Sequence, residues 1–288
     1  MKAELGMKCR EANLVTNTNK GSQRFGGDWT RTKLTILGEY LDNYTTALKN
    51  QDLRISYIDA FAGTGAVEVS QAWNGDQREF LDGSAQIAYD VRDRKFDKLV
   101  FIEKDGDKAK VLKGQFEDQS RIDVRVGDAN AELQRICSVG TQAFWQENRA
   151  VVLLDPFALE VEWATVEAIS QKPVFDVWIL LPIGAIRRMI PRRKLPGEVD
   201  PKWELKLNSV FGDESWKGMY QATPTLFGDQ IESMAGTDPI TELYKEKLTQ
   251  VFPMVAPRSA TLQNLRGSPL FEFIFAISNP SKRAQEAA

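Results

Sequence analysis

Acidic residues follow several apolar stretches of this 288-residue chain. An acid at the end of such a stretch can accept hydrogen bonds from a nucleotide-like ligand. Asp59, Glu103, Asp128 and Asp155 each stand at or just after a short apolar run. In open α/β sheets, ligands bind at the carboxyl ends of the parallel strands. A single acid there is commonly a turn residue or a helix cap. Four acids at one edge of a sheet favour a ligand site.

A glycine-rich turn follows the first of these acids, in the sequence Phe61-Ala62-Gly63-Thr64-Gly65. Glycine has no Cβ, so the backbone can turn tightly and approach a ligand closely. A dinucleotide-binding turn would carry a third glycine where this chain has Glu68, and an acid about 20 residues later. Here Glu103 comes 40 residues after Gly63. A dinucleotide site is therefore disfavoured but stays open, because an insertion at 72–83 would account for the difference.

The composition excludes several kinds of catalytic site. The chain has no histidine, and its two cysteines, Cys9 and Cys137, lie far apart. Zinc sites built from histidine and cysteine and Ser-His-Asp triads are therefore excluded, and we expect no metal. With 37 basic and 40 acidic residues, the net charge of −3 gives no global attraction to nucleic acid or membrane. The longest apolar run, 177–186, is too short to span a membrane. We expect a cytoplasmic protein, because two distant cysteines fit a reducing compartment.

The pattern of apolar residues predicts alternating strands and helices. Strands are expected at 55–60, 99–102, 122–126, 151–154 and 175–181, with a terminal hairpin of two strands at 261–265 and 270–278. Helices are expected at 34–48, 84–91 (capped by Ser84), 107–116, up to about 137, 161–170 and 238–248, with a short one beginning at 67. This order predicts an α/β fold with a doubly wound, mainly parallel sheet of seven strands, one of them antiparallel.

The chain is expected to form one domain at 28–280. Residues 1–27 are polar and are interpreted as a flexible leader, and 281–288 as a tail. The first helix carries its apolar residues at spacings of three and four, and we expect it to pack on the sheet edge. Residues from about 184 to 236 are irregular and rich in proline, and they are interpreted as an inserted helical lobe. Trp203 and Trp216 of this lobe could stack on bases, although packing inside the lobe is the more ordinary role.

The turn and the strand ends resemble a known family. Phe61–Gly65 is similar to the FxGxG turn of class I S-adenosylmethionine-dependent methyltransferases, especially those that methylate amino groups of nucleic acid bases. More narrowly, the chain resembles the three-Cys-motif partner family (TcmP). The residues that carry this resemblance are 39–41, 57–63, Gly83-Ser84, 101–103, 127–130, 154–157 and 267–271. It covers roughly residues 28–280, and it implies a Rossmann-like methyltransferase fold and S-adenosyl-L-methionine as cofactor.

The resemblance assigns the cofactor-binding residues. It implies that Phe61, Ala62, Gly63 and Gly65 pass close under the cofactor, and that Asp59 faces its amino-acid end. Glu103 would accept hydrogen bonds from the two ribose hydroxyls, with Lys104 beside it in the same site. Asp128 would accept from the adenine amino group, and Ala129 would donate its backbone N–H to the ring.

The resemblance also assigns a substrate loop, Asp155-Pro156-Phe157. In amino-methyltransferases a (D/N/S)PP(Y/F) loop follows the fourth strand, and its polar residue, proline carbonyl and aromatic ring contact an extruded base. This chain has a single proline, and its aromatic residue comes one position early, with Ala158 at the family's aromatic position. The alternative interpretation is a strand-end acid followed by a core phenylalanine.

A cluster of cations follows the fifth strand. Arg187, Arg188, Arg192, Arg193 and Lys194 fall within eight residues. A solvated charge run is the ordinary explanation of such a cluster. The alternative is a local patch that contacts nucleic acid phosphates beside the site.

These observations predict a methyltransferase that uses S-adenosylmethionine, acting on an amino group of a nucleic acid base. Two alternatives stay open. The first is a methyltransferase-like protein without catalysis that partners a protein carrying three cysteines, as the family resemblance implies. The second is a dinucleotide-dependent oxidoreductase.

Overall fold

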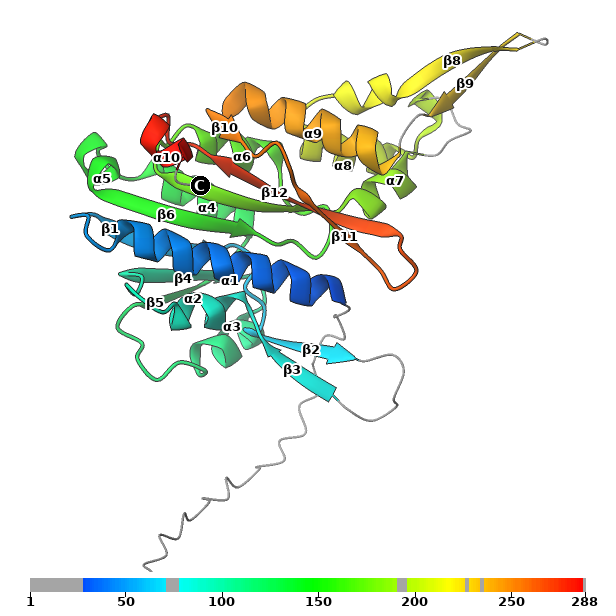
Figure 1. The fold of residues 1–288 in the computed structure, drawn as a ribbon. Helices are drawn as coiled ribbons and strands as arrows, with labels where there is room; N and C mark the ends of the chain where they lie inside the picture. The colour runs from blue at the N-terminus through cyan, green and yellow to red at the C-terminus, as the bar shows by residue number, and fades with distance from the viewer. Residues whose placement is uncertain (1–27, 71–77, 191–195, 226–227, 234–235, 287–288) are drawn as a thin grey trace, which may run out of the picture.

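The computed structural model describes residues 28–70, 78–190, 196–225, 228–233 and 236–286. Its centre is a twisted sheet in the order β10-β12-β7-β6-β1-β4-β5, with β11 paired to β12 (Figure 1). The strands of this sheet are β1 (Arg54–Asp59), β4 (Lys98–Glu103), β5 (Ile122–Val126), β6 (Asn148–Leu154), β7 (Phe175–Leu181), β10 (Met254–Val255), β11 (Ala260–Gln263) and β12 (Pro269–Ile277). The five strands β1, β4, β5, β6 and β7 pair in parallel. All five were predicted from the apolar runs.

The last strand runs against the others. β12 pairs antiparallel with β7, and also with β10 and β11. It is therefore the one strand of the sheet whose direction differs. The strand order, with a terminal antiparallel strand inserted beside β7, is that of a Rossmann-like methyltransferase fold. This confirms the predicted fold class and the predicted terminal hairpin.

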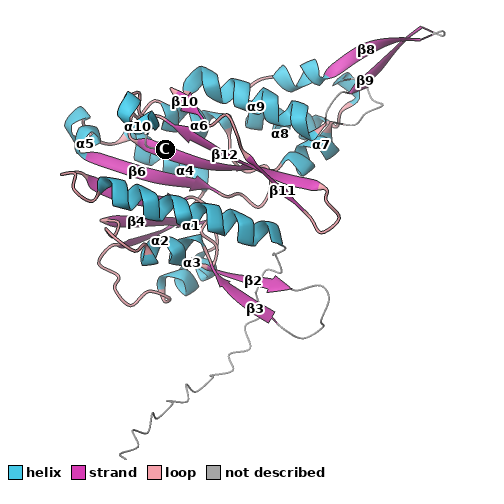
Figure 2. Ribbon diagram, viewed as in Figure 1, coloured by secondary structure: helices cyan, strands magenta, loops and turns pink. Residues whose placement is uncertain are grey.

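Helices cover both faces of the sheet, as Figure 2 shows. Successive residues of a strand point to opposite faces, so each strand supplies two cores. Ile55, Tyr57 and Leu99 pack with α1 (Asp28–Leu48), α2 (Ser84–Asp90) and α3 (Gly106–Lys113). Ile58, Val100 and Val152 pack with residues from a second set of helices on the other face. That set is α4 (Ala129–Ser138), α6 (Trp163–Ser170), α7 (Ile183–Met189), α8 (Pro201–Phe211) and α9 (Thr237–Val251).

The first helix lies over the face of the sheet, where an edge position had been expected. Tyr40 donates a hydrogen bond to Asp176 of β7, 2.5 Å away. Its ring also meets Trp178 of β7 and Phe275 of β12. The stripe of Leu37 and Leu41 is fully buried in this position. As a result, α1 lies lengthwise along the sheet, and its first turn reaches the edge where the parallel strands end (Figure 1).

One predicted helix is wrong. Residues from 67 onward form β2 (Ala66–Ser70), which pairs antiparallel with β3 (Arg78–Asp82). The reason is local: Val67 and Val69 alternate with other residues at a period of two, which is a strand pattern. The backbone N–H of Gly83 donates to the carbonyl of Gly65 and closes the base of this hairpin. The insertion predicted at 72–83 therefore contains a strand that extends outward from the glycine turn.

The remaining elements are short or lie in the inserted lobe. The lobe contains α7, α8, the 3-10 turns η1 (Pro196–Glu198) and η2 (Ser215–Met219), and a hairpin of β8 (Tyr220–Thr225) and β9 (Gly228–Ser233) that was not predicted. Trp216 is fully buried in it, which is the packing role expected, while Trp203 is exposed. Helices α5 (Gln142–Glu147), which was also not predicted, and α10 (Lys282–Glu286) lie at the opposite end of the molecule (Figure 1). Among the described helices, none is long and apolar enough to cross a membrane.

Candidate active site at the carboxyl edge of the sheet

The glycine turn after β1 is built on two left-handed residues. Gly63 has φ +59° and Gly65 has φ +78°, values that favour glycine. The backbone N–H of Ala62 donates to the carbonyl of Ile102 at 3.0 Å and ties the turn to β4. A Cβ at Gly65 would meet Leu112 Cδ1 at 2.6 Å, whereas a Cβ at Gly63 would meet nothing within 4 Å. Gly63 therefore borders open space, and Gly65 packs against α3.

Glu103 is fixed beside this turn by two backbone amides. Its Oε2 accepts from the Gly63 N–H at 2.9 Å, and its Oε1 accepts from the Asp105 N–H at 2.8 Å. Both carboxylate oxygens are thus oriented by groups that cannot rotate away. Each oxygen has a second lone pair for a further donor. Such a carboxylate can accept two neighbouring hydroxyl groups.

Asp128 begins the next helix. Its Oδ1 accepts from the N–H groups of Asn130 and Ala131 and so caps α4. Its Oδ2 lies 3.9 Å from the Nζ of Lys104, in an exposed ion pair. The N–H of Gly127 donates to the carbonyl of Glu103, so the β5 end is held against the β4 end. One oxygen of Asp128 is occupied by the cap, and the other has only the long contact to Lys104 among the described side chains. Ala129 is buried in the first turn of α4.

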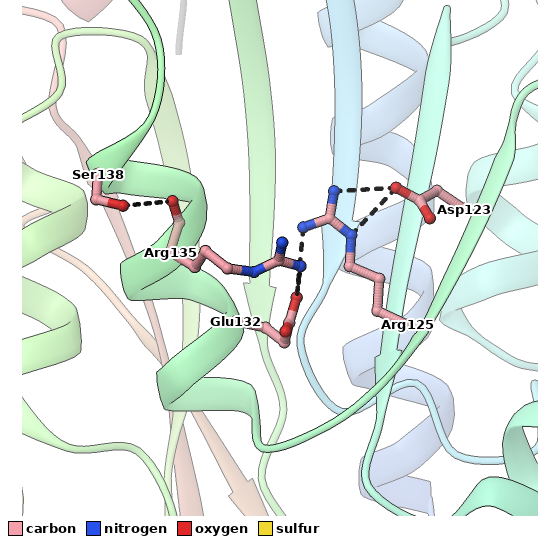
Figure 3. A network of polar contacts seen from close by, with 5 residues as sticks. All are labelled: Asp123, Arg125, Glu132, Arg135 and Ser138. Carbon is pink, nitrogen blue, oxygen red and sulfur yellow. Dashed lines mark hydrogen bonds and ion pairs between the residues drawn. The ribbon is translucent and has the colours of Figure 1, made fainter.

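A network of charges holds α4 against β5 (Figure 3). Arg125 of β5 contacts Asp123 at 3.0 Å and Glu132 of α4 at 3.4 Å. Arg135 contacts the same Glu132 at 2.5 Å. Because Glu132 lies one turn after Asp128, the network fixes where α4 begins. It therefore helps to position the cap residue at the sheet edge.

Asp59, at the end of β1, is fully buried beneath the turn. It accepts hydrogen bonds from the N–H of Phe61 and from the hydroxyls of Ser84 and Tyr57. Burial raises the pKa of Asp59 to about 6, against the lowering effect of the Ser84 hydrogen bond. Ser84 was expected to cap α2, but Gly83 occupies the cap position and the Ser84 hydroxyl is used on Asp59. The structure thus places Asp59 as a support of the turn.

Asp155, at the end of β6, forms an ion pair with Lys33 of α1. The Lys33 side chain is only 7% exposed and that of Asp155 20%. The Lys33 ammonium also lies 5.6 Å from the centre of the Trp29 ring. Sequence reasoning missed Lys33. The sequence did contain a sign of its role: Lys33 lies four residues before Leu37 and eight before Leu41. This spacing puts a single cation on the apolar face of the helix.

The two residues after Asp155 differ from each other. Pro156 is buried, whereas the Phe157 side chain is 63% exposed. The backbone N–H groups of Phe157 and Ala158 both face the carboxylate of Glu160, at 3.0 and 3.4 Å, which fixes the loop. A core phenylalanine had been the alternative interpretation, and the exposure of Phe157 excludes it. An aromatic residue therefore stands at the surface, two residues after Asp155 in the chain.

The cation cluster is described only in part. Arg187 and Arg188 are exposed on α7, which begins two residues after β7 ends at the same edge of the sheet. Arg192, Arg193 and Lys194 lie outside the described residues. The role of this cluster in binding phosphates therefore stays a prediction.

The strand order divides the site into two halves. β4 and β5 carry Glu103 and Asp128 on one side of β1, and β6 carries Asp155 on the other. The glycine turn and Asp59 lie between them. One half therefore offers fixed hydrogen-bond acceptors beside open space, and the other offers a carboxylate, a buried ammonium and an exposed aromatic ring. In the part of the chain that is described, no cluster of three or more histidine, cysteine, aspartate or glutamate residues could hold a metal.

Comparison with known proteins bears on the fold. No family model and no curated protein matches the chain. Among solved structures, the chain is similar to a protein from Legionella pneumophila described by the family model DUF519, with a TM-score of 0.52, 12% identity and 88% of each chain covered. The methyltransferase domain of bacterial CtHen1-C gives a TM-score of 0.37, 10% identity and coverage of 85% of this chain and 98% of that chain. Spermidine synthase from Thermotoga maritima gives a TM-score of 0.40 and 11% identity, and the match covers 88% of this chain and 61% of that chain.

The first of these similarities supports the fold alone, because its identity is low. The TM-scores of the other two, below 0.5, carry no argument. The resemblance to the three-Cys-motif partner family stays a prediction.

Proposed function

We propose that this protein is an S-adenosylmethionine-dependent methyltransferase that methylates an amino group of a nucleic acid base. The observation that carries the proposal is the arrangement of Gly63 and Glu103. A carboxylate held by two backbone amides stands beside a glycine that borders open space. A side chain at position 63 would fill that space. This combination suits a ligand with a ribose, because the carboxylate can accept both hydroxyls.

The remaining residues of this half fit the same cofactor. The Oδ2 of Asp128 is exposed and would accept from an adenine amino group in exchange for its long contact to Lys104. Asp59 would act beneath the turn, by holding the Phe61 N–H and Ser84 in place. When bound, the cofactor supplies a methyl group on a positively charged sulfur, so little acid or base chemistry is required of the protein. The absence of histidine is therefore no obstacle.

The substrate half is formed by Asp155, Lys33 and Phe157. A carboxylate oxygen of Asp155 would accept a hydrogen bond from the target amine and orient its lone pair, and the Lys33 ion pair would hold that carboxylate in one orientation. The exposed ring of Phe157 offers a face on which an extruded base could stack. Arg187 and Arg188 would contact phosphates of the same nucleic acid.

A non-catalytic partner of a three-cysteine protein is the second candidate. It is favoured by the substrate loop, which has one proline and carries Ala158 where amino-methyltransferases have their aromatic residue. A protein of this kind would keep the fold and transfer no methyl group alone. Incubation with labelled S-adenosylmethionine and total nucleic acid distinguishes the two candidates, because only the enzyme labels the nucleic acid.

Calorimetric titration with S-adenosylhomocysteine tests the proposal directly. We expect saturable binding by the intact chain and loss of at least about tenfold in affinity in Glu103→Ala, since a carboxylate that accepts two hydrogen bonds contributes more than about 1.5 kcal/mol. The matched control is Glu117→Ala, which removes an exposed acid in the loop after α3 and should bind as the unaltered chain does. Failure of the folded protein to bind would contradict the proposal.

A further inference from the structure

A cavity lies at the other edge of the sheet, where the parallel strands begin. It measures about 740 Å³ and is lined from the α5 region, the loop before β7 and the segment after β12. Figure 1 shows α5 and α10 together at this end, and the hairpins β2–β3 and β8–β9 at the opposite end. β6 runs from Asn148 at this edge to the residue before Asp155, a distance of about 20 Å at the rise of a strand. The cavity is therefore separate from the candidate active site.

The lining of the cavity is cationic and rich in amides. Among the residues whose side chains are described, it includes Arg149 and Lys172, together with Gln142, Gln146, Gln171 and Asn279, and no acidic residue. Two cations that share one hollow repel each other unless an anion lies between them or near them. Lys172 is half-buried, and within the described ranges it has no ion pair; its ammonium lies 5.8 Å from the centre of the Trp145 ring.

Arg149 is held in a fixed orientation. Its Nη1 donates to the carbonyls of Trp145, Gln146 and Asn148, at the end of α5. These bonds use one nitrogen of the guanidinium, and no described residue accepts from Nε or Nη2. Asp176 is the acid whose charge interacts with Arg149, but its carboxylate bonds Tyr40 and is not part of the cavity wall. Arg149 thus keeps a planar pair of donors, the geometry that binds two oxygens of one phosphate.

We propose that this cavity binds a small molecule that carries a phosphate or diphosphate group. Arg149 and Lys172 would neutralise the two charges of the phosphate, and the amides would bind the rest of the molecule. The volume lies within the roughly 300–1,000 Å³ of small-molecule sites. This site does not depend on the methyltransferase proposal, because it shares no residue with the carboxyl edge of the sheet.

Titration of the full chain with inorganic pyrophosphate tests this inference. We expect saturable binding that weakens about tenfold or more in Lys172→Gln, since a charge-assisted hydrogen bond is lost, and that Lys172→Arg largely restores. Lys113→Gln, which removes an exposed cation at the end of α3, should change the affinity less than about twofold, because a distant exposed charge is screened by salt. Thermal melting of each variant verifies that it is folded.

Three outcomes would overturn the proposal. The first is no pyrophosphate binding by the folded protein, and the second is an equal loss of affinity in Lys113→Gln. The third comes from a parallel titration with an eight-nucleotide single-stranded RNA. If that RNA requires Lys172 while pyrophosphate does not bind, the surface belongs to nucleic acid and not to a small ligand. S-adenosylhomocysteine binding is measured on the same samples, so failure of this site and failure of the cofactor site are distinguished.

Discussion

Lys33 and Asp155 are 122 residues apart in the chain and form an ion pair at the carboxyl edge of the sheet. The ammonium comes from the first helix and the carboxylate from the end of a central strand. A largely buried cation of this kind is tolerated only with a partner, so the pair ties α1 to the candidate active site. The two residues fix each other, and the position of the carboxylate depends on the helix.

The first prediction concerns this pair. In Lys33→Met, Asp155 loses its partner and its fixed orientation, and we expect methyl transfer to total nucleic acid to fall by about tenfold to a hundredfold. Binding of S-adenosylhomocysteine should stay within about twofold, because Glu103 and Gly63 are untouched and an effect confined to the substrate half leaves cofactor affinity nearly constant. The control is Lys49→Met, one residue after the end of the same helix, whose pair with Asp93 is exposed and contributes little. Unchanged transfer by Lys33→Met would refute a role in positioning.

The second prediction separates the two glycines of the turn. Gly63→Ala adds a methyl group that meets no protein atom, so stability should fall by only about 1–2 kcal/mol, from the left-handed backbone. Cofactor binding should nevertheless be lost. Gly65→Ala adds a methyl group against Leu112, so its stability should fall further. Urea denaturation and titration with S-adenosylhomocysteine of both variants test this contrast. If Gly63→Ala binds normally, the space above the turn is not the cofactor site.

Much of the fold could be predicted from the sequence because it depends on local patterns. The run at 151–154 that became part of β6 is wholly apolar, and such a run indicates a central parallel strand. The error at 67–71 was also local, since a five-residue segment fits a strand or a helix until its partner is known. That partner is β3, and no pattern in the sequence indicates that the two segments pair.

The candidate site could be predicted only in part. Acids at strand ends are visible in the sequence, so Asp59, Glu103, Asp128 and Asp155 were found. Their partners were not, because Lys33 and Ser84 reach the site through tertiary packing. The role of Asp59 follows from its complete burial, and no sequence pattern predicts that an acid at a strand end is completely buried.

The third prediction is a pH dependence that Asp59 causes. Burial raises its pKa from 3.8 to about 6, so between these values the folded state binds more protons than the unfolded state. The free energy of unfolding contributed by this group therefore falls as pH rises from about 4 to 6, by about 3 kcal/mol, and is constant above that. Asp59→Asn should remove this contribution and leave the similar one from Asp176, whose pKa burial also raises to about 6, so the decrease becomes smaller. Urea denaturation between pH 4 and 7 measures it, and an equal slope in both proteins would contradict the assignment.

The fourth prediction compares two tyrosines of α1. Tyr40 donates to the carboxylate of Asp176, whose pKa burial raises to about 6. The buried hydroxyl of Tyr44 finds no partner among the described residues. Tyr40→Phe leaves a buried carboxylate without its donor and should lower the free energy of unfolding at pH 7 by about 1–3 kcal/mol. Tyr44→Phe removes an unsatisfied hydroxyl and should be neutral or slightly stabilising. Equal losses would mean that both hydroxyls are bonded in solution.

The last prediction tests the exposed ring of Phe157, two residues after Asp155. Phe157 is 63% exposed, so Phe157→Ala removes little buried area and should change stability by less than about 0.5 kcal/mol. Stacking of one base on an aromatic ring contributes about 1–3 kcal/mol, and nucleic acid affinity should fall about fivefold to a hundredfold. The control is Leu205→Ala on α8, a similarly exposed apolar residue at 71%, which should leave affinity unchanged. Fluorescence anisotropy with a labelled oligonucleotide measures both variants. Equal affinities of Phe157→Ala and the unaltered protein would show that the ring does not hold a base and would favour the non-catalytic partner.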